Sequence, residues 1–201
     1  MDTQTNSTPL LDLEPAARQI AGMLDTIDDT RLTAPTPCPD VTVGAMLAHV
    51  GGLAVAFRDA ARKKLGPATG TAPSVESGVL EDGWRGTLPA ALDEMVAAWR
   101  SPEAWQGMTQ AGSVDLPGQV AGMVALNELV LHGWDLARST GQPYQAEEAH
   151  LRNTLALLAD LGDNPPPTSP FGPPVTVPDD APLVDRAVAR SGRRPDWQPG
   201  D

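Results

Sequence analysis

Glu128 and His132 are the residues whose types and spacing point most directly to chemistry. Four positions apart on an α-helix, they would share one face, with β-carbons about 6 Å apart. A carboxylate oxygen and an imidazole nitrogen at that spacing can bind one metal ion. His49, predicted to lie on the buried side of another helix, could supply a third ligand. Two histidines and one glutamate leave a coordination position open, which is typical of catalytic zinc sites.

The same three residues allow a simpler interpretation. A glutamate and a histidine four positions apart are more often a surface pair or a buried polar pair than a metal site. However, Glu128 lies among apolar residues, where an unpaired carboxylate is costly, and His49 also lies on an apolar face. From residue chemistry alone, a metal site and a buried polar pair both remain open. Iron(II) and nickel accept similar ligands, so the ion is not fixed either.

Several other side chains are candidates for supporting roles. Asp135 could hold a metal-bound histidine from behind, with a capping or surface role as the alternative. Arg138 could attract an anionic substrate, or be a solvated cation near a helix C-terminus. Trp134 is predicted to fill the core rather than to stack on a ligand. Cys38 has a proline on each side and is predicted to be inert, and His150 is predicted to lie on the surface among acidic neighbours.

Five segments with helical periodicity would position these residues. Thr42 is predicted to cap the second segment, and Gly141 to follow the fourth in the left-handed conformation. Residues 107–116 are predicted to be a break, because almost nothing in the chain shows the alternation of a strand. Packed lengthwise, four of the helices would form an antiparallel bundle with one helix in addition. The five segments run approximately over residues 9–28, 42–64, 87–99, 117–140 and 146–161, with a further short helix over 183–190.

Glycine and proline divide the chain. The stretch from Leu65 to Arg85 is long for a connection and is predicted to be mobile or to cover a site. A proline-rich tail follows Gly162. We therefore expect a helical bundle with the metal site over residues 1–162 and a proline-rich C-terminal extension, packed on the bundle, over residues 163–201.

Composition excludes several classes of function. The 201 residues include 26 Asp and Glu against 14 Lys and Arg, a net charge of −12, which argues against nucleic acid and anionic membranes as partners. No apolar run approaches the roughly 20 residues that cross a bilayer. The N-terminus lacks the features of a secretory signal, so a cytoplasmic location is expected. The single cysteine excludes an internal disulfide and any all-cysteine zinc site.

Two motifs resemble those of a known family. Residues 36–43 with Leu47-Ala48-His49-Val50 resemble the start of the second helix in the DinB-like metal-binding bundles. Residues 127–137 with 140–143 resemble the second signature of one branch, named for mycothiol-dependent maleylpyruvate isomerase. The tail, with Phe171-Gly172 and residues 192–196, is similar to the end of its short, single-domain members.

The resemblance implies an all-α, DinB-like four-helix bundle with an extra helix and a Pro-rich C-terminal tail. It implies that His49, Glu128 and His132 bind a divalent metal, most often Zn²⁺, with Ni²⁺ or Fe²⁺ as alternatives. It also implies a low-molecular-weight thiol such as mycothiol as co-substrate, and a small electrophile as the molecule acted on. The expected activity is that of a metal-dependent thiol S-transferase or isomerase, in a monomer or homodimer.

The sequence departs from the family pattern in places. Val41 stands where relatives often have tryptophan, and Gly44 where they often have a charge. The forty residues from Gly162 to Asp201 are too few for the isomerase's second domain, so maleylpyruvate itself is not the expected substrate. The competing hypotheses are a non-catalytic metal-binding module that binds or senses a small molecule, and a metal-free helical partner protein.

Overall fold

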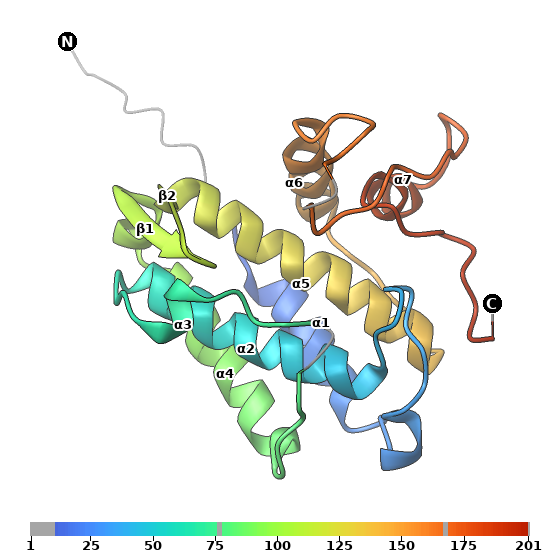
Figure 1. The fold of residues 1–201 in the computed structure, drawn as a ribbon, viewed down its shortest axis with the longest axis horizontal. Coiled ribbons are helices and arrows are strands. Elements are labelled where there is room, and N and C mark those ends of the chain that lie inside the picture. The colour runs from blue at the N-terminus through green and yellow to red at the C-terminus, as the bar shows by residue number, and fades with distance from the viewer. Residues whose placement is uncertain (1–10, 76–77, 167–168, 201) are drawn as a thin grey trace.

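Four helices pack lengthwise around one apolar core. The computed structural model describes residues 11–75, 78–166 and 169–200. Helix α2 contacts α4 and α5, and α1 contacts the same two helices, so each helix has two neighbours around the core (Figure 1). The predicted all-α fold with a four-helix bundle is confirmed. The bundle helices are α1 (Glu14–Leu24), α2 (Val43–Ala61), α4 (Trp84–Trp99) and α5 (Gly118–Thr140).

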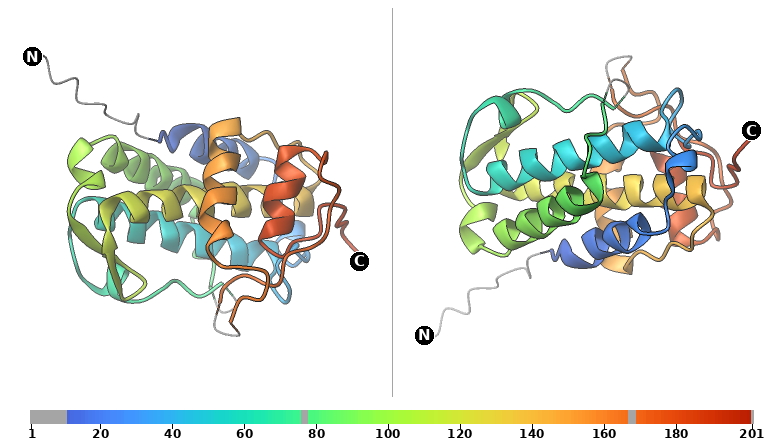
Figure 2. Two further views of the ribbon diagram at one scale, coloured as in Figure 1. Left: turned by 90° about the horizontal axis from the view of Figure 1, so that it is seen from above. Right: turned by 90° about the horizontal axis from the view of Figure 1, so that it is seen from below.

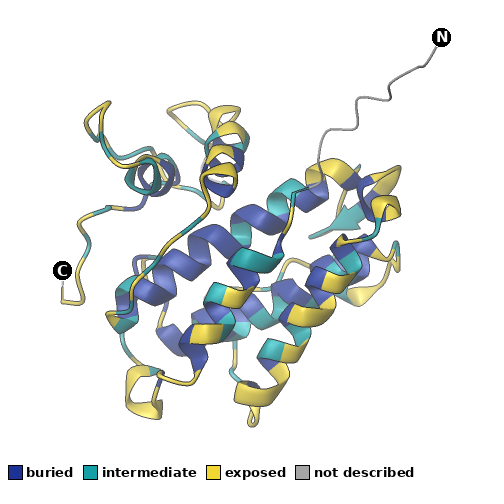
Figure 3. Cartoon of the chain, turned by 180° about the vertical axis from the view of Figure 1, so that it is seen from behind, coloured by how far each residue is buried: buried dark blue, intermediate teal, exposed yellow. Residues whose placement is uncertain are grey.

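Helix α5 is buried along almost its whole length (Figure 3). The bundle covers one side of it, and α6 (Glu148–Ala159) and α7 (Leu183–Arg190) lie across the other side (Figure 2). Val188 of α7 packs against Leu131 and Trp134 of α5. A helix covered from both sides can carry buried polar groups only if they find partners inside the protein.

Local signals set the ends of the helices that matter for the site. The Thr42 hydroxyl accepts a hydrogen bond from the Ala45 N–H at 3.2 Å, which confirms the predicted cap of α2. Gly141 has φ of 72° at the end of α5, as predicted. Helix α1 is shorter than the predicted segment, and part of that segment, including Leu10, lies outside the described residues.

The prediction of a break over residues 107–116 was wrong. Strands β1 (Met108–Ala111) and β2 (Val114–Pro117) pair antiparallel, with Met108 opposite Pro117. Gly112 and Ser113 have φ of 58° and 69°, the conformation that two-residue hairpin turns need. Each strand has only four residues, too few for a clear alternation of apolar and polar side chains.

The long connection between α2 and α4 packs against α2. It contains α3 (Pro67–Gly70), and Pro73 packs close to Gly52 of α2, where a β-carbon would lie 2.9 Å from the proline ring. Short 3₁₀ helices at Asp29–Arg31 and Pro102–Trp105 complete the described elements. Among the helices described, none has the length and apolar character needed to span a bilayer.

Candidate metal centre

Helices α2 and α5 bring the three predicted metal ligands together. His49 lies in the first half of α2, and Glu128 and His132 lie in the middle of α5. One ligand atom from each residue lies within 4.8 Å of the others. The two imidazole rings meet edge to face, with centroids 4.9 Å apart. Their geometry allows all three to contact one small ion.

Both ring nitrogens of His132 face carboxylates. Nε2 lies 2.9 Å from Oε2 of Glu128, and Nδ1 lies 3.1 Å from Oδ2 of Asp135. Burial disfavours the charged imidazole, but the hydrogen bonds to Asp135 and Glu128 outweigh it and raise the pKa of His132 to about 9. The pKa of Glu128 is lowered despite its burial, because His132 hydrogen-bonds to it. Because Asp135 holds Nδ1, the Nε2 atom of His132 is directed toward Glu128.

His49 has a different environment. Burial and the nearby charge of His132 lower its pKa to about 4, so the ring is neutral at pH 7. Its Nδ1 atom is buried and has no hydrogen-bond partner among the described residues. Unpartnered buried polar atoms are rare in folded proteins. A neutral imidazole with an unsatisfied nitrogen, next to a carboxylate and a second histidine, fits a divalent cation.

Asp135 lies behind His132, which fits the supporting role and not the capping or surface role that the sequence also left open, and it is fully buried. Its Oδ1 accepts from Nε of Arg193 at 2.7 Å, and its Oδ2 accepts from Nη2 of Arg193, also at 2.7 Å. Burial would raise the pKa of Asp135, but the charge of Arg193 and the contact with His132 lower it. A buried carboxylate therefore stays ionised beside the candidate ligand.

Sequence reasoning missed Arg193. It follows α7 and is only 7% exposed, and its Nη1 donates to the Ser191 hydroxyl at 3.0 Å. The only signal was its place in the tail motif at residues 192–196, because no helical spacing relates residue 193 to Asp135.

Trp134 and Arg138 lie on the side of α5 that faces the C-terminal extension. Trp134 packs with Leu131 and Val188, which agrees with the predicted role in the core. Arg138 donates to the carbonyl of Trp197 at 2.7 Å, and its guanidinium lies 5.7 Å from the Trp134 ring centre. These contacts join α5 to the extension and do not involve the three candidate ligands.

Cys38 and His150 are both less exposed than an ordinary surface residue. Burial and the charge of Asp135 raise the pKa of Cys38 to about 11, in line with the predicted inert thiol, and Arg193 contacts its sulfur at 3.4 Å. The prediction that His150 lies on the surface was wrong, since it is 2% exposed. It shares the inner face of α6 with Leu151 and Thr154, which outweighs the polarity of its sequence neighbours.

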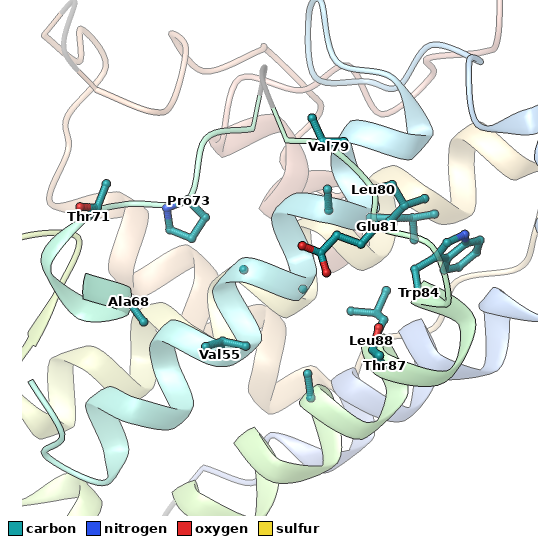
Figure 4. Close-up of a pocket in the computed structure, with 15 residues that line it drawn as sticks. Val55, Ala68, Thr71, Pro73, Val79, Leu80, Glu81, Trp84, Thr87 and Leu88 are labelled. Atoms are coloured by element: carbon teal, nitrogen blue, oxygen red, sulfur yellow. The ribbon is translucent and has the colours of Figure 1, made fainter. Parts of the chain in front are cut away.

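A groove of about 520 Å³ runs along α2 (Figure 4), and Leu47, Ala48 and Gly51, which flank His49 in the sequence, are among its lining residues. Its walls are α2, α4 and the connection between them, and most of its lining residues are apolar, with Glu81 as the one charged side chain among the described residues that line it. Pro73 lines the groove, and the backbone of Pro73 and Ser74 lies near enough to His49 to oppose part of the lowering of its pKa. The segment predicted to be mobile or to cover a site therefore lies next to both the groove and a candidate ligand.

One family model matches more than half of the chain. The family model described as "Mycothiol maleylpyruvate isomerase N-terminal domain" matches residues 13–137. Two uncharacterized proteins, from the CDC 1551 and H37Rv strains of Mycobacterium tuberculosis, are each 25% identical over 187 residues, covering 92% of this chain and 97% of theirs.

Solved structures show the same fold. The crystal structure of the mycothiol-dependent maleylpyruvate isomerase matches with a TM-score of 0.56, and that of a histidine-to-alanine mutant with 0.60. Both are 19% identical to this chain, and the match covers 78% of this chain and 72% of theirs.

Proposed function

The chain belongs to the family of the mycothiol maleylpyruvate isomerase N-terminal domain, and from this premise we propose that it is a divalent-metal enzyme that uses a low-molecular-weight thiol. The thiol would be of the mycothiol type, and the reaction an S-transfer to a small electrophile or a thiol-assisted isomerisation of it. His49, Glu128 and His132 would hold the metal, with Zn²⁺ the first candidate. The observation that carries the proposal is the convergence of these three donors within 4.8 Å.

The donor set supports catalysis better than a closed structural role. Three protein ligands leave a tetrahedral ion one position for an outside molecule, whereas structural zinc sites use four protein ligands. A bound divalent cation would lower the pKa of a coordinated thiol, so that the thiolate predominates near neutral pH.

The charges around the site suit one bound thiolate. The bidentate contact of Arg193 balances the charge of Asp135, and His49 is neutral. With His132 also neutral as a ligand, Glu128 would offset one of the two charges of a divalent cation. A single positive charge would remain in a buried site, and one thiolate would neutralise it.

The chain's own residues would orient the reacting groups. Asp135 holds Nδ1 of His132, which keeps Nε2 as the atom directed at the site. In the proposed reaction the thiol gives its proton to solvent, and the thiolate sulfur forms a bond to an electrophilic carbon of the substrate. In an S-transfer, the bond from that carbon to a leaving group breaks and the leaving group departs with the electron pair. In an isomerisation, the π bond at that carbon breaks and its electron pair moves onto the conjugated acceptor group; after rotation the pair returns, the C–S bond breaks and the thiolate is regenerated. The apolar groove beside α2 has the volume to hold the organic part of one of the two reactants.

Metal analysis of the purified protein tests the proposal. After bound metal is stripped with a chelator and the protein is reloaded with zinc, we expect about one zinc per chain. The His49→Ala variant should lose that zinc. His150→Ala is the matched control, because it removes another buried histidine outside the donor set. A wild-type protein without stoichiometric metal, or a His49→Ala protein that keeps it, would contradict the proposal.

Cobalt-substituted protein separates the enzyme from a non-catalytic metal-binding module. If the fourth position is open, adding mycothiol or a simple thiol should shift the cobalt absorption bands, because a sulfur ligand replaces water. The same addition to metal-loaded His150→Ala should give the same shift. A spectrum that the thiol leaves unchanged would favour the module.

A further inference from the structure

We propose that Arg193 is a positioning residue that couples the docking of the C-terminal extension to metal binding. The juxtaposition is a chain of contacts from Arg193 through Asp135 to His132, which joins the segment after α7 to the candidate metal centre. This inference rests on the metal site of the proposed function and adds a residue and a structural element to it.

Arg193 is held in place by the C-terminal extension itself. Its backbone N–H donates to the carbonyl of Val188 at 3.1 Å, and the Ser191 hydroxyl, which accepts from its guanidinium, donates to that same carbonyl. Val188 is fully buried against Leu131 and Trp134 of α5. The guanidinium can therefore reach Asp135 only when the end of α7 is seated on α5.

Asp135 links Arg193 to His132, one of the three candidate ligands. Its Oδ2 lies 2.7 Å from Nη2 of Arg193 and 3.1 Å from Nδ1 of His132, so one oxygen contacts both groups. Asp135 has no exposed surface, and water cannot replace Arg193 without entry into the core. Without the arginine, the carboxylate would be left buried with one partner, a costly state relieved by reorientation or protonation. Either change would release the Nδ1 side of His132.

Arg193 is buried against Asp135, whereas the neighbouring arginine is not. Arg194 is the next residue, yet its side chain is 55% exposed and pairs with Asp196 within the tail. Two parallel hydrogen bonds from a guanidinium fix a carboxylate in plane, which the point charge of a lysine does not do. The burial of Arg193 therefore reflects its contact with Asp135 and not a general basic character of the segment.

Linkage makes the coupling reciprocal. If a docked extension favours the geometry that binds metal, then bound metal must favour the docked extension by the same factor. The extension would thus respond to the occupancy of a site whose three ligands lie on other elements.

Zinc affinity tests the role of Arg193, measured by competition with a chromophoric chelator at one pH. We expect Arg193→Met to bind zinc about 10–100-fold more weakly, the usual effect of losing support behind a metal ligand. Arg193→Lys should recover only part of the affinity. Arg194→Met is the matched control and should stay within about twofold of wild type, because its side chain lies outside this chain of contacts. Equal affinities for wild type and a folded Arg193→Met would overturn the proposal.

Hydrogen exchange of the wild-type protein gives a second test that needs no variant. Zinc should slow exchange at the amides of Val175, Gly192 and Arg193, which donate within the extension. If Arg193→Met fails to fold, this measurement decides. Exchange that zinc leaves unchanged would overturn the coupling even where wild type binds zinc, whereas failure of wild type to bind zinc would overturn the proposed function and the coupling together.

Discussion

The two histidines of the site owe their different states to their immediate neighbours. His132 lies between two carboxylates, while His49 meets the backbone of Pro73 and Ser74 and has one buried nitrogen without a partner among the described residues. The two imidazoles therefore have different surroundings: the carboxylate of Asp135 orients His132, while the connection between α2 and α4 lies against His49. Glu128 is the one carboxylate of the donor set, so its negative charge should contribute strongly to metal binding.

Glu128→Gln should weaken zinc binding by at least about tenfold, because a carboxamide keeps the shape but offers no charge to a dication. Chelator competition measures this. Glu147→Gln is the matched control, since Glu147 lies 3.6 Å from the other buried histidine, His150, and should leave the affinity at the wild-type value. Equal losses in both variants would assign the effect to general electrostatics.

Cys38 should alkylate slowly near neutral pH in metal-stripped, folded protein. Its pKa is raised to about 11 by burial and by the charge of Asp135, and only the thiolate is nucleophilic. The rate with iodoacetamide should therefore keep rising with pH beyond about 9, whereas the same protein in guanidinium chloride should level off above the ordinary thiol pKa of about 8.5. A folded-state rate that levels off at the same pH as the unfolded one would contradict this.

The helices of the bundle tolerate added methyl groups very differently. Gly122 of α5 lies against Trp105, where a β-carbon would come within 2.5 Å of the ring, while a β-carbon at Gly22 of α1 would meet nothing within 4 Å. Trp105 is itself fixed by a 2.7 Å hydrogen bond to the carbonyl of Trp99. The indole cannot move aside without loss of this bond.

Gly122→Ala should lower the free energy of unfolding by about 1–3 kcal/mol, the usual cost of overpacking a core. Gly22→Ala, the same change in an exposed helical position, should raise it by about 0.4–1 kcal/mol, because alanine restricts the unfolded chain. Urea denaturation followed by circular dichroism measures both. Changes of the same sign would show that helix propensity and not packing governs these positions.

Elements set by local signals could be predicted from sequence, and those set by distant contacts could not. The Thr42 cap, the Gly141 terminus and the shared face of Glu128 and His132 each depend on a few neighbouring residues. The hairpin after residue 107 was missed because its strands are short, although Gly112-Ser113 carries the turn signal. Arg193 meets Asp135 from 58 residues away, and its role depends on where α7 docks.

The whole molecule carries a net charge of −12, and most of its described positive side chains form ion pairs. Self-repulsion of this size destabilises a compact chain, and dissolved salt screens it. We expect the melting temperature to rise as sodium chloride increases from about 0.05 to 0.5 M. Potassium chloride should act equally if screening is the cause. A melting temperature that falls with either salt would show that the ion pairs outweigh the repulsion.

The contact between Arg193 and Asp135 also orders events during biosynthesis. His49, Glu128 and His132 are synthesised before Arg193, so until Arg193 follows, Asp135 of the nascent chain lacks its cationic partner. Until that contact forms, the support behind His132 is incomplete and zinc should bind more weakly. Stalled nascent chains that include Arg193 should therefore bind zinc more tightly than chains that stop before it, as measured by chelator competition.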